Sequence, residues 1–340
     1  MFIKTIITFI KGIMMGAADV VPGVSGGTIA FISGIYEELI ETINSINLKN
    51  IKLLLSLKLK RFWHAINGNF IAPLLIGILF SILTLANSIG LIINNPEETK
   101  AKVLLWAFFF GLIVASVLYM AKQLKRWDAK SVVFFAIGTI ITVAISIMSP
   151  ANGPDSLWFI FVSGIIAICA MILPGISGSF ILLLLGAYSI VFGKISALME
   201  GLKAMDSQII FANLIPLLIF GLGCVIGILS FAKLISWLFK KHHNSTIALL
   251  TGFLLGSLFK IWPWKITKEF RLNSHGVEIP YIQDNIMPNE FASINGNSYL
   301  LSVILFALIG FILLFSIEFI GNKLSKNNEM SPDKDFLSRE

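Results

Sequence analysis

The stretch Pro22-Gly23-Val24-Ser25-Gly26-Gly27 returns about 150 residues later as Pro174-Gly175-Ile176-Ser177-Gly178-Ser179. Both copies lie inside long apolar segments, where a Pro-Gly break frees backbone polar groups that lipid cannot satisfy. Paired breaks at corresponding places in two halves of a membrane protein are typical of a transporter with its binding site near the membrane midplane. The repeated stretch therefore predicts an internally duplicated membrane transporter.

The composition supports a membrane protein. Of the 340 residues, 56% are hydrophobic and only 13% are charged, whereas soluble domains carry about 25% charged residues. The net charge of +7 is spread over the loops between apolar segments, as the positive-inside rule describes. We therefore expect the bilayer as a partner and no nucleic acid. The cysteines and histidines lack the spacing of metal ligands, so neither a metal nor a cofactor is expected.

The apolar segments predict an all-α polytopic fold. Six of them are long enough to cross a bilayer once each, at 70–92, 103–121, 131–149, 212–237, 246–262 and 299–321. The two motif segments, 3–46 and 158–198, are apolar on both sides of the break and carry no charged loop there. This pattern predicts two re-entrant helical hairpins whose irregular tips are buried in protein.

The distribution of lysine and arginine predicts the orientation. With the N-terminus in the cytoplasm, the cytoplasmic loops carry fifteen of these residues and the opposite loops seven. This places both termini in the cytoplasm, with a charged, disordered tail at 322–340. The polar loop at 263–298 lies on the outer side, and its Trp262-Pro263-Trp264 start predicts an anchor at the membrane interface.

The internal similarity extends past the motif and defines the domains. Gly34, Tyr36 and the stretches 69–75 and 111–116 correspond to Gly186, Tyr188, 213–218 and 252–257, in the same order. Residues 1–124 and 158–262 are therefore predicted to be two repeats, each a hairpin plus two transmembrane helices. The helix at 131–149 links them, and a single crossing between equivalent units turns the second upside down. The C-terminal helix at 299–321 lies outside the repeat.

The tips carry the residue types of an anion site. A helix resumes after each break, and its first N–H groups and positive dipole end favour a phosphate. The candidate phosphate-binding residues are Gly23, Ser25, Gly26, Gly27, Thr28, Gly175, Ser177, Gly178 and Ser179. Two inverted tips would meet near the midplane and hold one phosphate between them. The alternative is that the small residues only pack helices together.

Charged residues near the tips are further candidates. Asp19 has no counterpart in the second motif, where Met171 stands; it is a candidate proton relay, cation site or helix cap. Glu38, in the cluster after Gly34, is a candidate gating residue, although a solvated helix end that faces the cytoplasmic lysines is the favoured interpretation. The isolated cations Lys11, Lys194 and Lys233 are expected to reach the membrane interface.

The two motifs resemble the PopT-type polyprenyl-phosphate translocase family. The similarity rests on residues 16–28 and 173–179, and it extends to about residue 260. Membership implies a transporter of the bacterial cytoplasmic membrane. It would flip undecaprenyl phosphate from the outer to the inner leaflet and so recycle the carrier lipid for cell-envelope synthesis. The resemblance puts Asp19, Ser25, Thr28, Ser177 and Ser179 at the site, with a proton or sodium as candidate coupling ion.

Two other functions share this pattern. Undecaprenyl-pyrophosphate phosphatases also have inverted re-entrant repeats, with a tip that reads Pro-Gly-x-Ser-Arg-Ser. The arginine position is Gly26 in one motif and Gly178 in the other, so the charge that stabilises a transferring phosphoryl group is missing. The sequence therefore predicts a transporter and not an enzyme. A transporter of soluble anions, or one coupled to ions, remains the other alternative.

Overall fold

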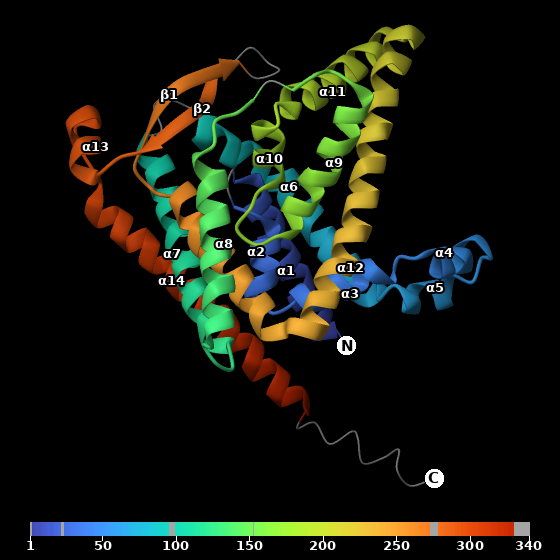
Figure 1. Ribbon diagram of the computed structural model, residues 1–340, viewed down its shortest axis with the longest axis horizontal. Helices are drawn as coiled ribbons and strands as arrows, with labels where there is room; N and C mark the ends of the chain where they lie inside the picture. The colour runs from blue at the N-terminus through green and yellow to red at the C-terminus, as the bar shows by residue number, and fades with distance from the viewer. Residues whose placement is uncertain (1, 22–23, 95–98, 152, 273–277, 330–340) are drawn as a thin grey trace.

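The computed structural model describes residues 2–21, 24–94, 99–151, 153–272 and 278–329. Within these ranges the chain is helical except for one two-stranded hairpin, and the helices form a single bundle (Figure 1). The first helix begins, and the last helix ends, at the end of the bundle opposite the hairpin (Figure 1). Apolar helices of this length make the chain a multi-pass membrane protein.

Several helices are long and apolar enough to cross a bilayer: α6 (Gly68–Asn94), α7 (Thr99–Gln123), α8 (Ala129–Ile147) and α12 (Ser207–Lys260). The backbone of α12 leaves helical geometry at His242. The spans expected at 212–237 and 246–262 therefore lie on its two arms, residues 207–241 and 243–260. In the apolar stretch of α7, 56% of the residues are buried, against 17% in α8, so neighbouring helices cover α7 more completely than α8.

The two motif segments have the same local structure. Each is a long helix, a break, a seven-residue helix, a glycine in the left-handed region and a further helix. The elements are α1 (Phe2–Val20), α2 (Gly26–Ile32) and α3 (Tyr36–Ser45), then α9 (Leu157–Ile172), α10 (Gly178–Leu184) and α11 (Ala187–Ala204). Gly34 and Gly186 have φ of 70° and 74°, values that cost glycine little. They turn the chain sharply, and α10 and α11 meet at 105°.

Glycines join the long helices in matching pairs. A β-carbon on Gly12 of α1 would overlap the carbonyl oxygen of Leu74 in α6. At the equivalent place, one on Gly164 of α9 would lie 2.5 Å from the carbonyl oxygen of Phe220 in the first arm of α12. Such close backbone approach is typical of helix packing in membranes. The contact between the first two long helices is thus built the same way in both halves.

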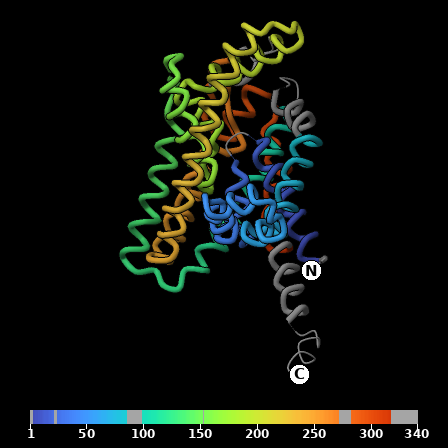
Figure 2. Tube along the Cα trace, turned by 90° about the vertical axis from the view of Figure 1, so that its right-hand side faces the viewer, coloured from blue at the N-terminus to red at the C-terminus, as the bar shows by residue number. Residues whose placement is uncertain are grey.

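A second pair of glycine contacts involves the helices outside the predicted repeat. Gly252, on the second arm of α12, faces the backbone of α8 at Phe135, and the two helices run side by side (Figure 2). Gly111 of α7 faces the backbone of α14 (Leu300–Glu329) at Ala307 in the same manner. Because Gly111 and Gly252 correspond in sequence, α14 packs on the first half as α8 packs on the second.

Short elements complete the fold at both ends. α4 (Leu48–Leu55) and α5 (Leu59–Ala65) contain no buried residue and project from the bundle near the end where α1 begins (Figure 1). Two antiparallel strands, β1 (Lys265–Leu272) and β2 (Glu278–Asn285), and α13 (Pro288–Asn295) form the loop before α14. This hairpin is the one departure, among the described residues, from the all-helical fold.

The tryptophans at the start of the polar loop and the beginning of the C-terminal tail each have a structure that the sequence did not predict. The indole N–H of Trp262 donates to the Ile286 carbonyl at 2.9 Å, and that of Trp264 donates to the Ser298 carbonyl at 2.8 Å. The tryptophans thus hold the two ends of the polar loop to the bundle, and their role as an interface anchor stays a prediction. α14 continues to Glu329, so the start of the expected disordered tail extends the helix, and residues 330–340 lie outside the described chain.

Candidate functional site

The two tips are in direct contact through hydrogen bonds between the motifs. The hydroxyl of Ser25 donates to the carbonyl oxygen of Met171 at 2.9 Å. In the other direction, the N–H of Gly175 donates to the hydroxyl oxygen of Thr28 at 2.8 Å. Ser25 and Thr28 are 1% and 0% exposed. Backbone groups freed by one break are therefore satisfied by side chains of the other, which is what an irregular segment inside a membrane requires.

Glycine is required where the tips touch. A β-carbon on Gly27 would lie 2.5 Å from the carbonyl oxygen of Ile172 and 2.9 Å from that of Met171. Both atoms belong to the backbone at the end of α9, so they cannot swing away as a flexible side chain would. In the described conformation there is accordingly no space for a phosphate between Gly27 and Ile172.

Two charged side chains of α1 form hydrogen bonds with the two ends of α2, the short helix of the first tip. Asp19 Oδ1 accepts a hydrogen bond from the N–H of Gly26 at 2.6 Å, at the N-terminus of α2. Lys11 Nζ donates to the carbonyl oxygen of Ser33 at 2.6 Å, at the C-terminus of α2. A carboxylate at the positive end and an ammonium at the negative end of a helix both stabilise it. Asp19 thus acts as a helix cap, and its carboxylate stands where the sequence placed a phosphate.

The second tip has no such carboxylate. Met171 stands at the position of Asp19, and the side chain of Ser177 makes no capping hydrogen bond to α10. The hydroxyls of Ser177 and Ser179 lie 2.9 Å apart. Ser177 is buried, whereas Ser179 is exposed. Among the predicted serines and threonine of the tips, Ser179 of the second motif is therefore the one that is exposed.

The predicted site residues divide into three groups. Ser25, Gly27, Thr28 and Gly175 meet at the contact between the tips, whereas the contacts of Gly26, Ser177, Gly178 and Ser179 lie within their own motifs. Gly23 lies outside the described residues, as does Pro22. The carboxylate of Glu38 accepts a hydrogen bond from Asn67 at 3.1 Å. It therefore joins α3 to the turn before α6, and the described contacts do not connect it to either tip.

The two remaining isolated cations have ordinary surroundings. A further cation, which the sequence pattern did not indicate, lies beside the second tip. Lys194 pairs with Asp155 at 3.1 Å, and Lys233 is exposed. Lys260, which was not among the predicted candidates, lies against the second tip with its Nζ 3.9 Å from the ring centroid of Phe180. The sequence feature that could have indicated Lys260 is its position at the end of an apolar run, just before Trp262.

Replacing Thr28 with valine is expected to destabilise the protein. The change keeps the shape but leaves the buried N–H of Gly175 without its acceptor, which costs about 1–3 kcal/mol in the free energy of unfolding. Thr28→Ser keeps the hydroxyl and should lose less. Thermal unfolding of the two purified variants in detergent measures the difference. A larger loss in Thr28→Ser than in Thr28→Val would assign the effect to the methyl group instead of the hydrogen bond.

Comparison with known proteins adds independent information. The sequence model of a family described as VCA0040-like, undecaprenyl phosphate translocase-like, matches residues 15–279. A polyprenyl-phosphate transporter of Vibrio cholerae serotype O1 is 43% identical over 301 residues, which cover 88% of this chain and 91% of that protein. A polyprenyl-phosphate transporter of Staphylococcus aureus is 32% identical over 269 residues, 76% of this chain and 86% of that protein. No solved structure matches the chain.

Proposed function

Because this chain belongs to the undecaprenyl phosphate translocase-like family, we propose that it flips undecaprenyl phosphate from the outer to the inner leaflet of a bacterial cytoplasmic membrane. The observation that carries the proposal is the meeting of two polar tips, distant in sequence, inside an apolar bundle. A lipid phosphate has the same division into a polar head and an apolar chain. The head is handled at the tips while the prenyl chain stays in the bilayer.

We propose that the halves are inverted repeats with re-entrant hairpins. The matching local structure of the two motif segments and the matching glycine contacts support this arrangement. The equivalent packing of α8 and α14 extends the repeat to those helices, so that each half contains a hairpin and three further crossings. In this proposal both termini lie in the cytoplasm and the β1–β2 hairpin lies outside, an orientation that the positive-inside count supports.

The phosphate binds on the second motif in this proposal. Ser177 and Ser179 supply hydroxyl donors, while Gly175 and Gly178 are buried and let the tip pack closely against the backbone of Phe253 and Ala167. The first tip already holds an anion, the carboxylate of Asp19. Two anions at one helix end repel each other, so the headgroup reaches the first tip only when Asp19 is neutralised or displaced. This gives a physical basis for coupling to a proton or a cation.

Rocking of the halves moves the headgroup between leaflets. Since the tips touch in the described conformation, a phosphate passes between them only after the bonds from Ser25 and Thr28 open. Those bonds therefore form one closed state of an alternating-access cycle.

Hydrolysis of the lipid is not favoured by the packing at the arginine position of the phosphatases. A β-carbon on Gly26 would lie 2.5 Å from Asp19 Oδ2, and one on Gly178 would lie 2.6 Å from the Ala167 carbonyl oxygen. A side chain at Gly178 would meet fixed backbone and one at Gly26 would meet the Asp19 carboxylate, so neither tip carries the guanidinium expected to stabilise a transferring phosphoryl group.

Proteoliposomes containing labelled undecaprenyl phosphate test the function directly. Headgroup accessibility on each side reports flipping, and a parallel assay measures phosphate released from the pyrophosphate lipid. We expect flipping without release. Release would support a phosphatase, and inactivity with both lipids would favour a transporter of soluble anions.

The double variant Ser177→Ala with Ser179→Ala is expected to weaken binding of the lipid phosphate about tenfold. Two hydroxyl hydrogen bonds to a charged group are lost, each worth about 1.5–3 kcal/mol before water replaces them. The matched control is Ser230→Ala, because Ser230 is exposed and bonds only within its own helix at 2.6 Å. Wild-type affinity in the double variant would remove the second tip from the site.

A further inference from the structure

A separate cavity lies beside the second tip, at the hairpin end of the bundle. Its volume is about 390 Å³, and it is enclosed by the C-terminal ends of α8 and α12, by α10 and by β2. Its walls combine apolar side chains, Met148, Phe180 and Ile282 among them, with about as many polar ones, such as Ser149 and Asn285. Lys260 supplies the ammonium.

The positive charge at this cavity is not balanced. Lys265 Nζ donates to the carbonyl oxygen of Lys260 and lies 4.2 Å from the ring centroid of Trp106. Within the part of the chain that the structure describes, neither lysine has a carboxylate at ion-pair distance. Burial and the neighbouring charge of Lys260 hold the pKa of Lys265 well below its usual value. An anion placed beside Lys260 would favour the charged form of this lysine.

The one carboxylate among the described residues of the cavity wall is already neutralised. Asp284 of β2 lines the cavity, but it forms an ion pair with Lys268 of β1. Lys260 contacts the face of Phe180 instead, at 3.9 Å. A cation on an aromatic face remains able to bind an anion from its other side, since the ring uses none of its hydrogen-bond donors.

The chemistry of the walls selects the kind of anion. Ile147, Met148 and Phe259 line the cavity and are 63%, 57% and 43% exposed, so apolar surface continues from the cavity onto the outside of the bundle. We propose that this cavity is a docking site for a phosphomonoester carried on an apolar chain, with Lys260 on the phosphate and the chain along the exposed ends of α8 and α12. The inference rests on the proposed function, because it supplies the first binding step for the flipped lipid.

The position of the cavity connects docking with the tip. Phe180, which Lys260 covers, directly follows Ser179 in α10. The cavity and the exposed hydroxyl of Ser179 thus both adjoin the start of α10, and in this proposal the phosphate moves from Lys260 to that tip. Lys260 acts before the tip in this order, so its loss should raise the lipid concentration needed for half-maximal transport and leave the maximal rate nearly unchanged.

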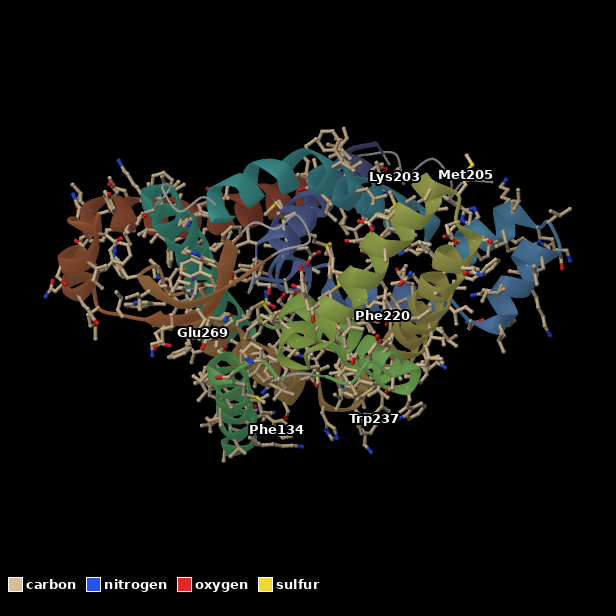
Figure 3. All side chains as sticks on the ribbon, turned by 90° about the horizontal axis from the view of Figure 1, so that it is seen from above. Phe134, Lys203, Met205, Phe220, Trp237 and Glu269 are labelled. Atoms are coloured by element: carbon tan, nitrogen blue, oxygen red, sulfur yellow. The ribbon has the colours of Figure 1, made fainter. Side chains whose placement is uncertain are left out.

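The test uses the full chain in nanodiscs and a photoreactive farnesyl monophosphate with a diazirine on its prenyl chain. We expect label in the segments 146–150 and 282–285, and about tenfold less of it with Lys260→Gln at the same probe concentration. Lys260→Arg should retain most of the labelling. The matched control is Lys203→Gln, since Lys203 is exposed and lies far across the molecule from Glu269 of the hairpin (Figure 3).

Each result has a defined meaning. Undiminished labelling with Lys260→Gln would overturn the proposal, and equal labelling by the diazirine-bearing farnesol would show a merely apolar pocket. Inorganic phosphate that competes as strongly as farnesyl monophosphate would overturn the lipid assignment in favour of a free anion. Wild-type protein that takes up the label in these segments but does not flip lipid would refute the proposed function and leave the site standing.

Discussion

Gly27→Ala is expected to reduce transport about tenfold or more. The added methyl group would collide with the carbonyl oxygens of Ile172 and Met171, both backbone atoms at the end of α9. Overpacking of this kind costs about 1–3 kcal/mol, and 1.4 kcal/mol already changes a population or a rate tenfold. The collision acts on the closed state alone, so it shifts the halves away from the contact that the cycle must form and break.

Gly221→Ala is the matched control, because nothing lies within 4 Å of a β-carbon built at Gly221. Both glycines are helical and lie in apolar segments, so a general effect of alanine on helix stability should appear in both. Flipping in proteoliposomes gives the comparison. Normal transport by the Gly27 variant would show that the tips do not need to close on each other.

Two replacements of Asp19 are expected to distinguish its role as a helix cap from the effect of its negative charge. Asp19→Ala removes the acceptor for the N–H of Gly26, and loss of a hydrogen bond to a charged group costs about 1.5–3 kcal/mol. We expect transport to fall by about tenfold or more in this variant. Asp19→Asn keeps an acceptor oxygen at the same place but carries no charge, so it should fold normally and transport with a flattened dependence on pH.

The readout is the flipping rate across a pH series together with the unfolding temperature. If Asp19→Asn retains the wild-type pH profile, the carboxylate is only a cap and the coupling role is wrong. If Asp19→Asn is as unstable as Asp19→Ala, the negative charge itself holds α2, in agreement with the opposite charge of Lys11 at the other end of that helix.

Local sequence signals predicted much of this site. Proline, glycine and serine at fixed spacing located both breaks, and the offset between the copies matched Gly34 with Gly186, which the structure places in the same left-handed conformation. The repeat also predicted that the tips would meet. Such features depend on the backbone requirements of a few residues, and these are visible in the chain itself.

Other features depend on contacts between distant segments, which no local stretch of sequence predicts. Ser25 and Thr28 were expected to face a phosphate, yet they bond the opposite tip, because a buried break must first satisfy its own backbone. The approach of Lys260 to Phe180 joins two distant segments. The β1–β2 hairpin was not anticipated either, since its alternating residues lie in a charged loop that hydropathy alone treats as unstructured.

The reciprocal packing of α8 and α14 has a consequence for the order in which the protein can be assembled during its synthesis. Gly138 of α8 faces α12 at Leu249, and Gly111 of α7 faces α14 at Ala307. The ribosome completes α7 and α8 long before the helices that cover them. Both helices therefore expose their glycine faces to lipid until their partner helices insert. For α7, this lasts until the last helix has entered the membrane, although α7 is the most buried of the long apolar helices in the described chain.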